Sequence, residues 1–114
     1  MFYLKIWVDD IRPAPEGYVW CKSVNQAKEA IFDAEREFAF NYRNGNRDLK
    51  FLVEIIDLDY DSGDYEKDGG SYIKLMDWLV ERGTLYPLAF HSQNCVGMEN
   101  MKRMYRRYWL GESL

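Results

Sequence analysis

A short apolar run near the middle of the chain limits the available folds more than any other feature. Residues 51–56, Phe-Leu-Val-Glu-Ile-Ile, are almost continuously apolar and rich in β-branched side chains. A run of this length and composition is typical of a buried central strand rather than a helix. Other strand-like and helical segments alternate along the chain, which predicts helices packed around a mainly parallel sheet.

Three further segments have the composition of strands. They are residues 2–8, residues 88–90 and a shorter stretch, 18–21, whose direction the sequence leaves open. The connection from Asp9 to Gly17 is too short to hold a crossover helix. A parallel second strand would therefore have to be reached through a loop.

The spacing of apolar residues predicts three helices. Ser23-Val24-Asn25-Gln26 matches a capping box before the first helix, which is expected to end by residues 44–46. Ser71 is expected to cap the second helix, which ends at Gly83, and Asn94 or a neighbour begins the third. The element order predicts one α/β domain over residues 1–114, with three layers and a short, mainly parallel four-stranded sheet.

Composition excludes several classes of protein. The 114 residues are 47% hydrophobic and 17% aromatic with a net charge of −4, which argues against disorder and against a generic nucleic-acid-coating protein. Cys21 and Cys95 match no metal or disulfide spacing, so free thiols are expected, with Cys95 a small buried residue. The sequence shows neither a signal peptide nor a membrane-spanning run, which predicts a cytoplasmic protein.

Two acidic clusters follow predicted strands. Asp9 and Asp10 open the stiff, charged corner Asp-Asp-Ile-Arg-Pro-Ala-Pro, and a second cluster follows the central strand. Because the carboxyl ends of parallel strands share one edge, four carboxylates are expected to meet there: Asp9, Asp10, Asp59 and Asp61. Such an all-oxygen cluster suits Mg²⁺, Mn²⁺ or Ca²⁺ rather than Zn²⁺. The alternative is a set of solvated turn residues, with Asp10 paired to Arg12.

The second cluster also has the 1-3-5 spacing of a calcium-binding EF-hand loop. It begins at Asp57, and Asp68 would occupy position 12. However, Ser62 stands where that loop needs glycine, and the preceding segment is predicted to be a strand. An EF-hand is therefore not expected.

The loop His91-Ser92-Gln93-Asn94 follows the last predicted strand. His91 is the only histidine, and an imidazole can transfer protons near neutral pH. Ser92 and Asn94 could bind an anion, particularly if Asn94 begins a helix. The alternative for His91 is a hydrogen bond within its own loop.

The last predicted helix combines a basic outer face with an aromatic stripe. Lys102, Arg103, Arg106 and Arg107 form that basic face, which is either a solvated surface or a guide for an anionic ligand or RNA end. Tyr105, Tyr108 and Trp109 are expected to belong to the core or to a homodimer contact.

Three motifs together resemble the cyclic-phosphate processing receiver-like domains of bacteria and their phages. Residues 9–17, Asp-Asp-Ile-Arg-Pro-Ala-Pro-Glu-Gly, resemble the opening signature, and residues 58–63 resemble a central signature that usually reads Leu-Asp-His-Asp-Leu-Gly. Residues 91–94, with Val96, Gly97 and Met101 after them, resemble the third. The resemblance implies a receiver-like fold and a site lined by Asp9, Asp10, Arg12, Asp59, Asp61, His91, Ser92 and Asn94.

The resemblance also implies an activity, the processing or binding of a cyclic phosphate or phosphoester from a nucleotide or an RNA end. It implies a metal-assisted phosphoesterase in which the catalytic residues are His91, Asp59 and Asp10 and the phosphate ligands are Arg12, Ser92 and Asn94. Mg²⁺ or Mn²⁺ would be held by Asp9, Asp10, Asp59 and Asp61.

Tyr60 departs from the family pattern, which has histidine there. A non-catalytic ligand-binding or protein-interaction module is therefore the alternative. Classical phosphotransfer signalling with Asp59 as acceptor is a weaker interpretation, because no lysine follows a further strand.

Overall fold

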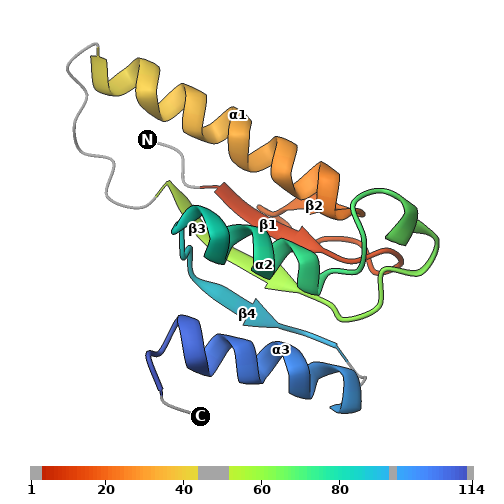
Figure 1. Cartoon of the computed structure of the whole chain (residues 1–114). Coiled ribbons are helices and arrows are strands. Elements are labelled where there is room, and N and C mark those ends of the chain that lie inside the picture. The colour runs from red at the N-terminus through yellow and green to blue at the C-terminus, as the bar shows by residue number, and fades with distance from the viewer. Residues whose placement is uncertain (1–3, 44–51, 93–94, 113–114) are drawn as a thin grey trace.

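The structure is a computed structural model and describes residues 4–43, 52–92 and 95–112. Strands and helices alternate along the chain as predicted (Figure 1). The elements are β1 (Leu4–Val8), β2 (Val19–Cys21), α1 (Val24–Arg43), β3 (Val53–Leu58), the 3₁₀ helix η1 (Gly63–Lys67), α2 (Ile73–Arg82), β4 (Leu88–Phe90) and α3 (Cys95–Tyr108).

The four strands form one sheet in the order β2-β1-β3-β4. All three neighbouring pairs are parallel, including β1 and β2, whose direction the sequence left open. A loop without a helix makes the crossover between these two strands. The predicted α/β class and four-stranded parallel sheet are confirmed.

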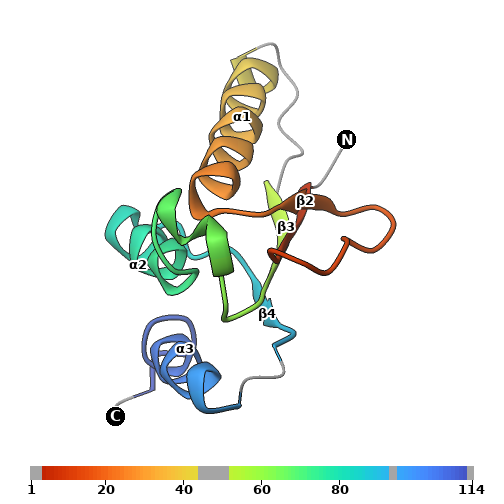
Figure 2. The ribbon, with the colours of Figure 1, turned by 90° about the vertical axis from the view of Figure 1, so that its right-hand side faces the viewer.

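The layers differ from the prediction. The three helices lie on one side of the sheet (Figure 2), where they cover the fully buried Ile6, Val8, Ile56 and Leu58. Side chains that alternate with these, such as Trp7 and Asp57, are only partly buried on the opposite face. The described part of the chain therefore has two layers and not the expected three.

The direction of the crossovers explains this arrangement. The connections from β2 to β3 and from β3 to β4 both run toward the β4 edge of the sheet. Right-handed crossovers that run in one direction place their helices on the same face. The crossovers thus place α1 and α2 on one face, whereas α3 follows β4 and belongs to no crossover.

The capping box before α1 is present in a modified form. Ser23 Oγ accepts the backbone N–H of Gln26 at 3.0 Å, whereas the Gln26 side chain reaches back to the N–H of Lys22 at 2.8 Å. The expected stop at residues 44–46 lies outside the described residues. The helix α2 begins one residue later than predicted, after Tyr72, and ends at Gly83 in the left-handed conformation.

The helix α3 contributes Met98 and Met101 to the core, with Tyr105 and Trp109 packed partly against it. Tyr108, expected on the same stripe, is exposed. Cys21 is a free, buried thiol, and burial raises its pKa to about 11. The Cys95 side chain lies outside the part that can be described. Among the described helices, none has the length and apolar character needed to span a membrane.

Candidate functional site

The loop that leaves β1 is held by two indole rings and one carboxylate. Trp7 Nε1 donates to the carbonyl of Arg12 at 3.0 Å, and Trp20 Nε1 donates to the carbonyl of Asp9 at 2.7 Å. Asp9 Oδ1 accepts the backbone N–H groups of Ile11 and Arg12 at 2.9 and 2.8 Å. These bonds fix the direction of the Asp9 side chain at the strand end.

Carboxylates from the ends of β1 and β3 converge beside this loop. The Asp59 N–H donates to the carbonyl of Val8 at 2.9 Å, which ties the two strand ends together. Oxygen atoms of Asp9, Asp10 and Asp59 lie within 4.8 Å of one another. They open onto a pocket of about 400 Å³ that is lined by Asp9, Asp10, Ile11, Arg12, Asp59, Asp61 and Ser92. The expectation that the two acidic clusters meet is confirmed.

The carboxylates affect one another electrostatically. Burial raises the pKa of Asp10, and the charges of Asp9, Asp59 and Asp61 raise it further against the opposing effect of its own backbone N–H. This repulsion is the kind that a bound cation relieves. The donor set of three carboxylates therefore fits a divalent cation that prefers oxygen ligands.

The backbone of Gly63 packs directly against the Asp10 side chain. A Cβ atom at this position would lie 2.3 Å from Asp10 Oδ2, and the backbone φ of +53° is one that favours glycine. Glycine is thus required for the Asp10 carboxylate to lie where it does. Gly63 belongs to the central sequence motif, but the motif does not predict its contact with Asp10.

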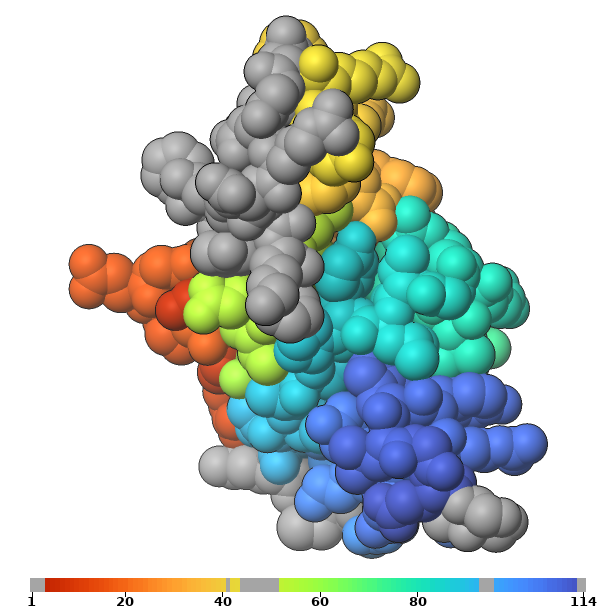
Figure 3. All heavy atoms as spheres, turned by 90° about the vertical axis from the view of Figure 1, so that its left-hand side faces the viewer, coloured from red at the N-terminus to blue at the C-terminus, as the bar shows by residue number. Residues whose placement is uncertain are grey.

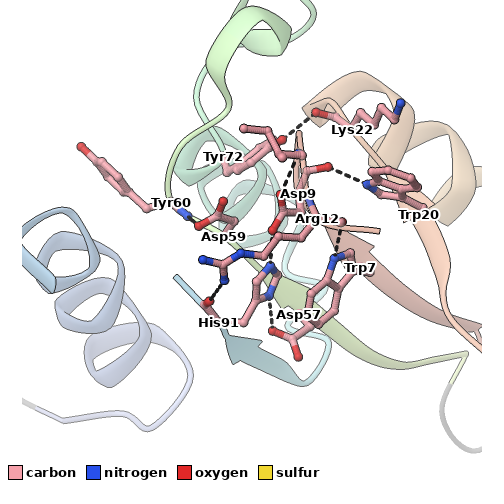
Figure 4. A network of polar contacts seen from close by, with 11 residues as sticks. Trp7, Asp9, Arg12, Trp20, Lys22, Asp57, Asp59, Tyr60, Tyr72 and His91 are labelled. Carbon is pink, nitrogen blue, oxygen red and sulfur yellow. Dashed lines mark hydrogen bonds and ion pairs between the residues drawn. The ribbon is translucent and has the colours of Figure 1, made fainter. Parts of the chain in front are cut away.

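His91 lies behind Asp9 and not among the side chains that line the pocket. Its Nε2 is 2.9 Å from Asp9 Oδ2, and its Nδ1 is 2.7 Å from Asp57 Oδ1 (Figure 4). The ring stacks on Trp7 with a centroid distance of 3.7 Å and an interplanar angle of 8°. Both ring nitrogens can donate to their carboxylates only when the imidazole is protonated.

The pKa directions agree with this arrangement. Burial alone lowers the pKa of His91, but hydrogen bonds and charges from Asp57 and Asp9 outweigh it and raise the pKa above its ordinary value. Burial likewise raises the pKa of Asp9, yet the N–H groups of Arg12 and Ile11, together with His91, hold it below the usual value. Asp9 and His91 therefore favour an ion pair.

Asp57 is the partner that sequence reasoning missed. It was grouped with Asp59 and Asp61, but it is the fifth residue of β3 and points to the opposite face from Leu58. Asp57 lies inside β3 and Asp59 lies beyond its end, so the position of the strand end was the signal that could have separated the two carboxylates. Trp7, the stacking partner of His91, was also not predicted.

The predicted phosphate ligands are only partly described. Arg12 Nη1 donates to the His91 carbonyl at 3.0 Å, and among the described contacts it has no ion pair with Asp10. Arg12 and Ser92 both line the pocket, and so does the exposed Asp61. Asn94 lies outside the described residues.

Asp68 has a structural role away from this pocket. Its carboxylate accepts hydrogen bonds from Ser23 Oγ at 2.6 Å and Asn25 Nδ2 at 3.0 Å, at the start of α1. The loop that contains it follows a strand. These contacts agree with the expectation that the segment is not an EF-hand.

Tyr60 points away from the carboxylates and toward α3 (Figure 4). Its backbone N–H donates to Asp59 Oδ1 at 2.8 Å, while its ring packs closely on Gly97. A Cβ atom at Gly97 would lie 2.3 Å from the ring. The Tyr60 side chain therefore packs against α3.

A parallel α/β sheet with three aspartates at its carboxyl edge is the arrangement of a receiver-like domain. The family model of the Cyclic-phosphate processing Receiver domain matches residues 4–107. The chain therefore belongs to this family, and the predicted resemblance is confirmed. Searches of curated proteins and of solved structures gave no match.

Proposed function

We propose that the pocket binds a cyclic phosphate or related phosphoester, derived from a nucleotide or an RNA end, together with Mg²⁺ or Mn²⁺. The observation that carries the proposal is the convergence of Asp9, Asp10 and Asp59 beside Arg12 and Ser92. Four carboxylates and one guanidinium line the pocket. Such a site would repel a phosphate unless a cation bound first.

Asp9, Asp10 and Asp59 would hold the cation, with Asp61 at the exposed side of the pocket. Arg12 would bind phosphate oxygens, assisted by Ser92 and, in this proposal, Asn94. When bound, the cation would neutralise the phosphate and lower the pKa of a coordinated water.

Turnover would require two proton movements. Water would attack phosphorus, Asp59 or Asp10 would accept its proton, and the departing sugar oxygen would take up a proton as the ring P–O bond breaks. His91 is the residue expected for proton transfer. Because both of its ring nitrogens contact carboxylates, it would have to leave Asp9 to reach a substrate.

One observation favours the alternative, a ligand-binding module without turnover. The pocket lining contains neither a histidine nor the Tyr60 side chain, which is packed on Gly97. Binding needs only the carboxylates, Arg12 and Ser92, whereas general acid catalysis needs a further proton donor.

A single panel of experiments tests the binding and separates the two versions. The protein is incubated with Mg²⁺ or Mn²⁺ and with 2′,3′-cyclic nucleotides and ADP-ribose cyclic phosphate, and thermal unfolding and ³¹P NMR are recorded. We expect a cation-dependent rise in melting temperature that Asp59→Asn abolishes. The matched control is Asp64→Asn, which removes an exposed carboxylate outside the pocket lining.

The two readouts have different meanings. New ³¹P resonances that require the cation and Asp59 would support the enzyme. Stabilisation without product would support the binding module. If neither the cations nor any member of the panel stabilises the protein, the proposed site is wrong.

A further inference from the structure

The strand β4 forms one edge of the described sheet. The Pro87 carbonyl accepts the N–H of Ile56 at 2.9 Å, and the His91 N–H donates to the Leu58 carbonyl at 3.0 Å. Main-chain groups of alternate residues point to opposite sides of a parallel strand. The N–H and C=O groups of Leu88 and Phe90 therefore point to the open edge, away from β3.

A groove of about 290 Å³ lies beside this edge, between β4 and α3, and is lined by Leu88, Phe90, Lys102, Tyr105, Arg106 and Leu110. We name it the β4–α3 groove. Seen from the end of the sheet opposite the carboxylate pocket, β4 and α3 lie side by side at the surface (Figure 3). The groove shares no lining residue with the carboxylate pocket.

We propose that the β4–α3 groove binds an extended, acidic segment of a partner protein, which adds a strand beside β4. Such a segment would pair its main chain with Leu88 and Phe90 and place alternate side chains over the groove. The apolar lining would take one of those side chains, and Lys102 and Arg106 would pair with neighbouring carboxylates.

Charge favours an acidic partner over a second copy of the chain. Lys102 and Arg106 are exposed and line the groove, and no acidic residue does. Two copies joined symmetrically through this surface would face each other with the same basic side chains. A partner with carboxylates has the complementary charge.

The aromatic side chains favour a peptide over RNA. The Tyr105 ring meets the Phe90 ring edge-on, with a centroid distance of 5.6 Å, and stacks on the Trp109 ring with a centroid distance of 6.1 Å. Both contacts already engage the Tyr105 ring within the protein, whereas stacking with a base needs an uncovered aromatic face. The open strand edge offers alternating donors and acceptors, which another main chain matches.

The shortness of β4 determines what such binding depends on. Three residues offer few main-chain hydrogen bonds. An added strand therefore needs both the backbone pairing and the positive charges of Lys102 and Arg106. We therefore expect binding to fail when either contribution is removed.

The test uses the full chain and a fluorescent ten-residue peptide of alternating glutamate and valine, measured by anisotropy. Lys102→Glu with Arg106→Glu should weaken binding at least about tenfold. The matched control is Arg103→Glu with Arg107→Glu, which changes the net charge equally on the same helix but outside the groove. The control should change binding by less than about twofold.

Two further arms test the main-chain pairing and the choice of partner. N-methylation of every second peptide residue should abolish binding, and the unmodified peptide should shift the amide NMR signals of Leu88 and Phe90. Equal binding of the methylated peptide, or equal losses in both charge variants, would overturn the proposal. So would single-stranded RNA that binds more tightly than the peptide and loses affinity in the groove variant alone.

Discussion

At the scale of single residues, the pocket depends on contacts behind its wall. Asp57 and Asp9 hold His91 from both sides, and Trp7 covers one face of its ring. Asp9 Oδ1 in turn accepts the backbone N–H of Arg12 and so stabilises the loop that contains Asp10 and Arg12. His91 thus also positions Asp9, one of the carboxylates proposed to hold the cation.

This arrangement predicts a pH-dependent stability. Because the folded pKa of His91 is raised above the ordinary value of 6.5, its protonated form favours the fold. The contribution is fully present below pH 6.5 and is lost as the pH rises through the raised folded pKa. Urea unfolding across this range should show a fall in the free energy of unfolding that His91→Gln removes.

His91 is the only histidine, so no other imidazole contributes to this slope. The terminal amine is shared by both proteins and cancels in the comparison. An identical fall in the wild type and the variant would contradict a charged His91 in the fold.

Gly63 provides a second test at this scale. Gly63→Ala should displace Asp10, because the new Cβ would lie 2.3 Å from its carboxylate, and should weaken Mn²⁺ binding measured by calorimetry. Gly17→Ala is the matched control, since Gly17 also has a positive φ but nothing lies within 4 Å of its Cβ position. Both changes should cost about 1–2 kcal/mol in unfolding free energy from the backbone alone. Only Gly63→Ala should weaken the binding of Mn²⁺.

At the scale of elements, the position of α3 depends on the close contact between Gly97 and the Tyr60 ring. Alanine is normally favoured over glycine in a helix, by up to about 1 kcal/mol in the interior, and Gly97 is the third residue of α3. Gly97→Ala should instead lower the unfolding free energy by about 1–2 kcal/mol, because its methyl group would overlap the Tyr60 ring.

A double-mutant cycle with Tyr60→Ala measures this contact by chemical denaturation. Removing the ring should restore the benefit of alanine at Gly97, so the two changes should be strongly non-additive. Additive free energies would show that the ring does not constrain the helix.

The sequence could predict the elements because their patterns are local. The capping box at Ser23, the apolar run of β3 and the acidic corner at Asp9 are all features of neighbouring residues. The meeting of Asp10 and Asp59 also followed, since parallel strands end at one edge.

Directions in space could not be predicted with the same rules. Asp57 and Asp59 are two residues apart, yet one faces His91 and the other the pocket, because the strand ends between them. The Tyr60 ring turns toward Gly97, a contact between distant segments. A helical layer on the second face of the sheet was expected because such folds usually have one. Excluding that layer required the direction of every crossover, which the sequence does not show.

At the scale of the whole molecule, the basic outer side of α3 bears on self-association. A homodimer through the last helix stays a prediction, and sedimentation velocity tests it. Because Lys102, Arg103, Arg106 and Arg107 are exposed, a contact between two α3 helices should be weak at low salt and strengthen as salt screens the repulsion. A dimer that forms at low salt and dissociates at high salt would require a different surface.

The crowded carboxylates of the pocket also bear on the lifetime of the protein. The fold brings Asp10 close to the charges of Asp9, Asp59 and Asp61 without a compensating basic partner among the described contacts. Under the proposed function, a cation that binds only the folded chain would offset this cost and raise stability with its concentration. Depletion of the cation would increase the unfolded fraction that proteases degrade. The supply of a divalent metal would then control how much of this protein persists, as well as what it binds.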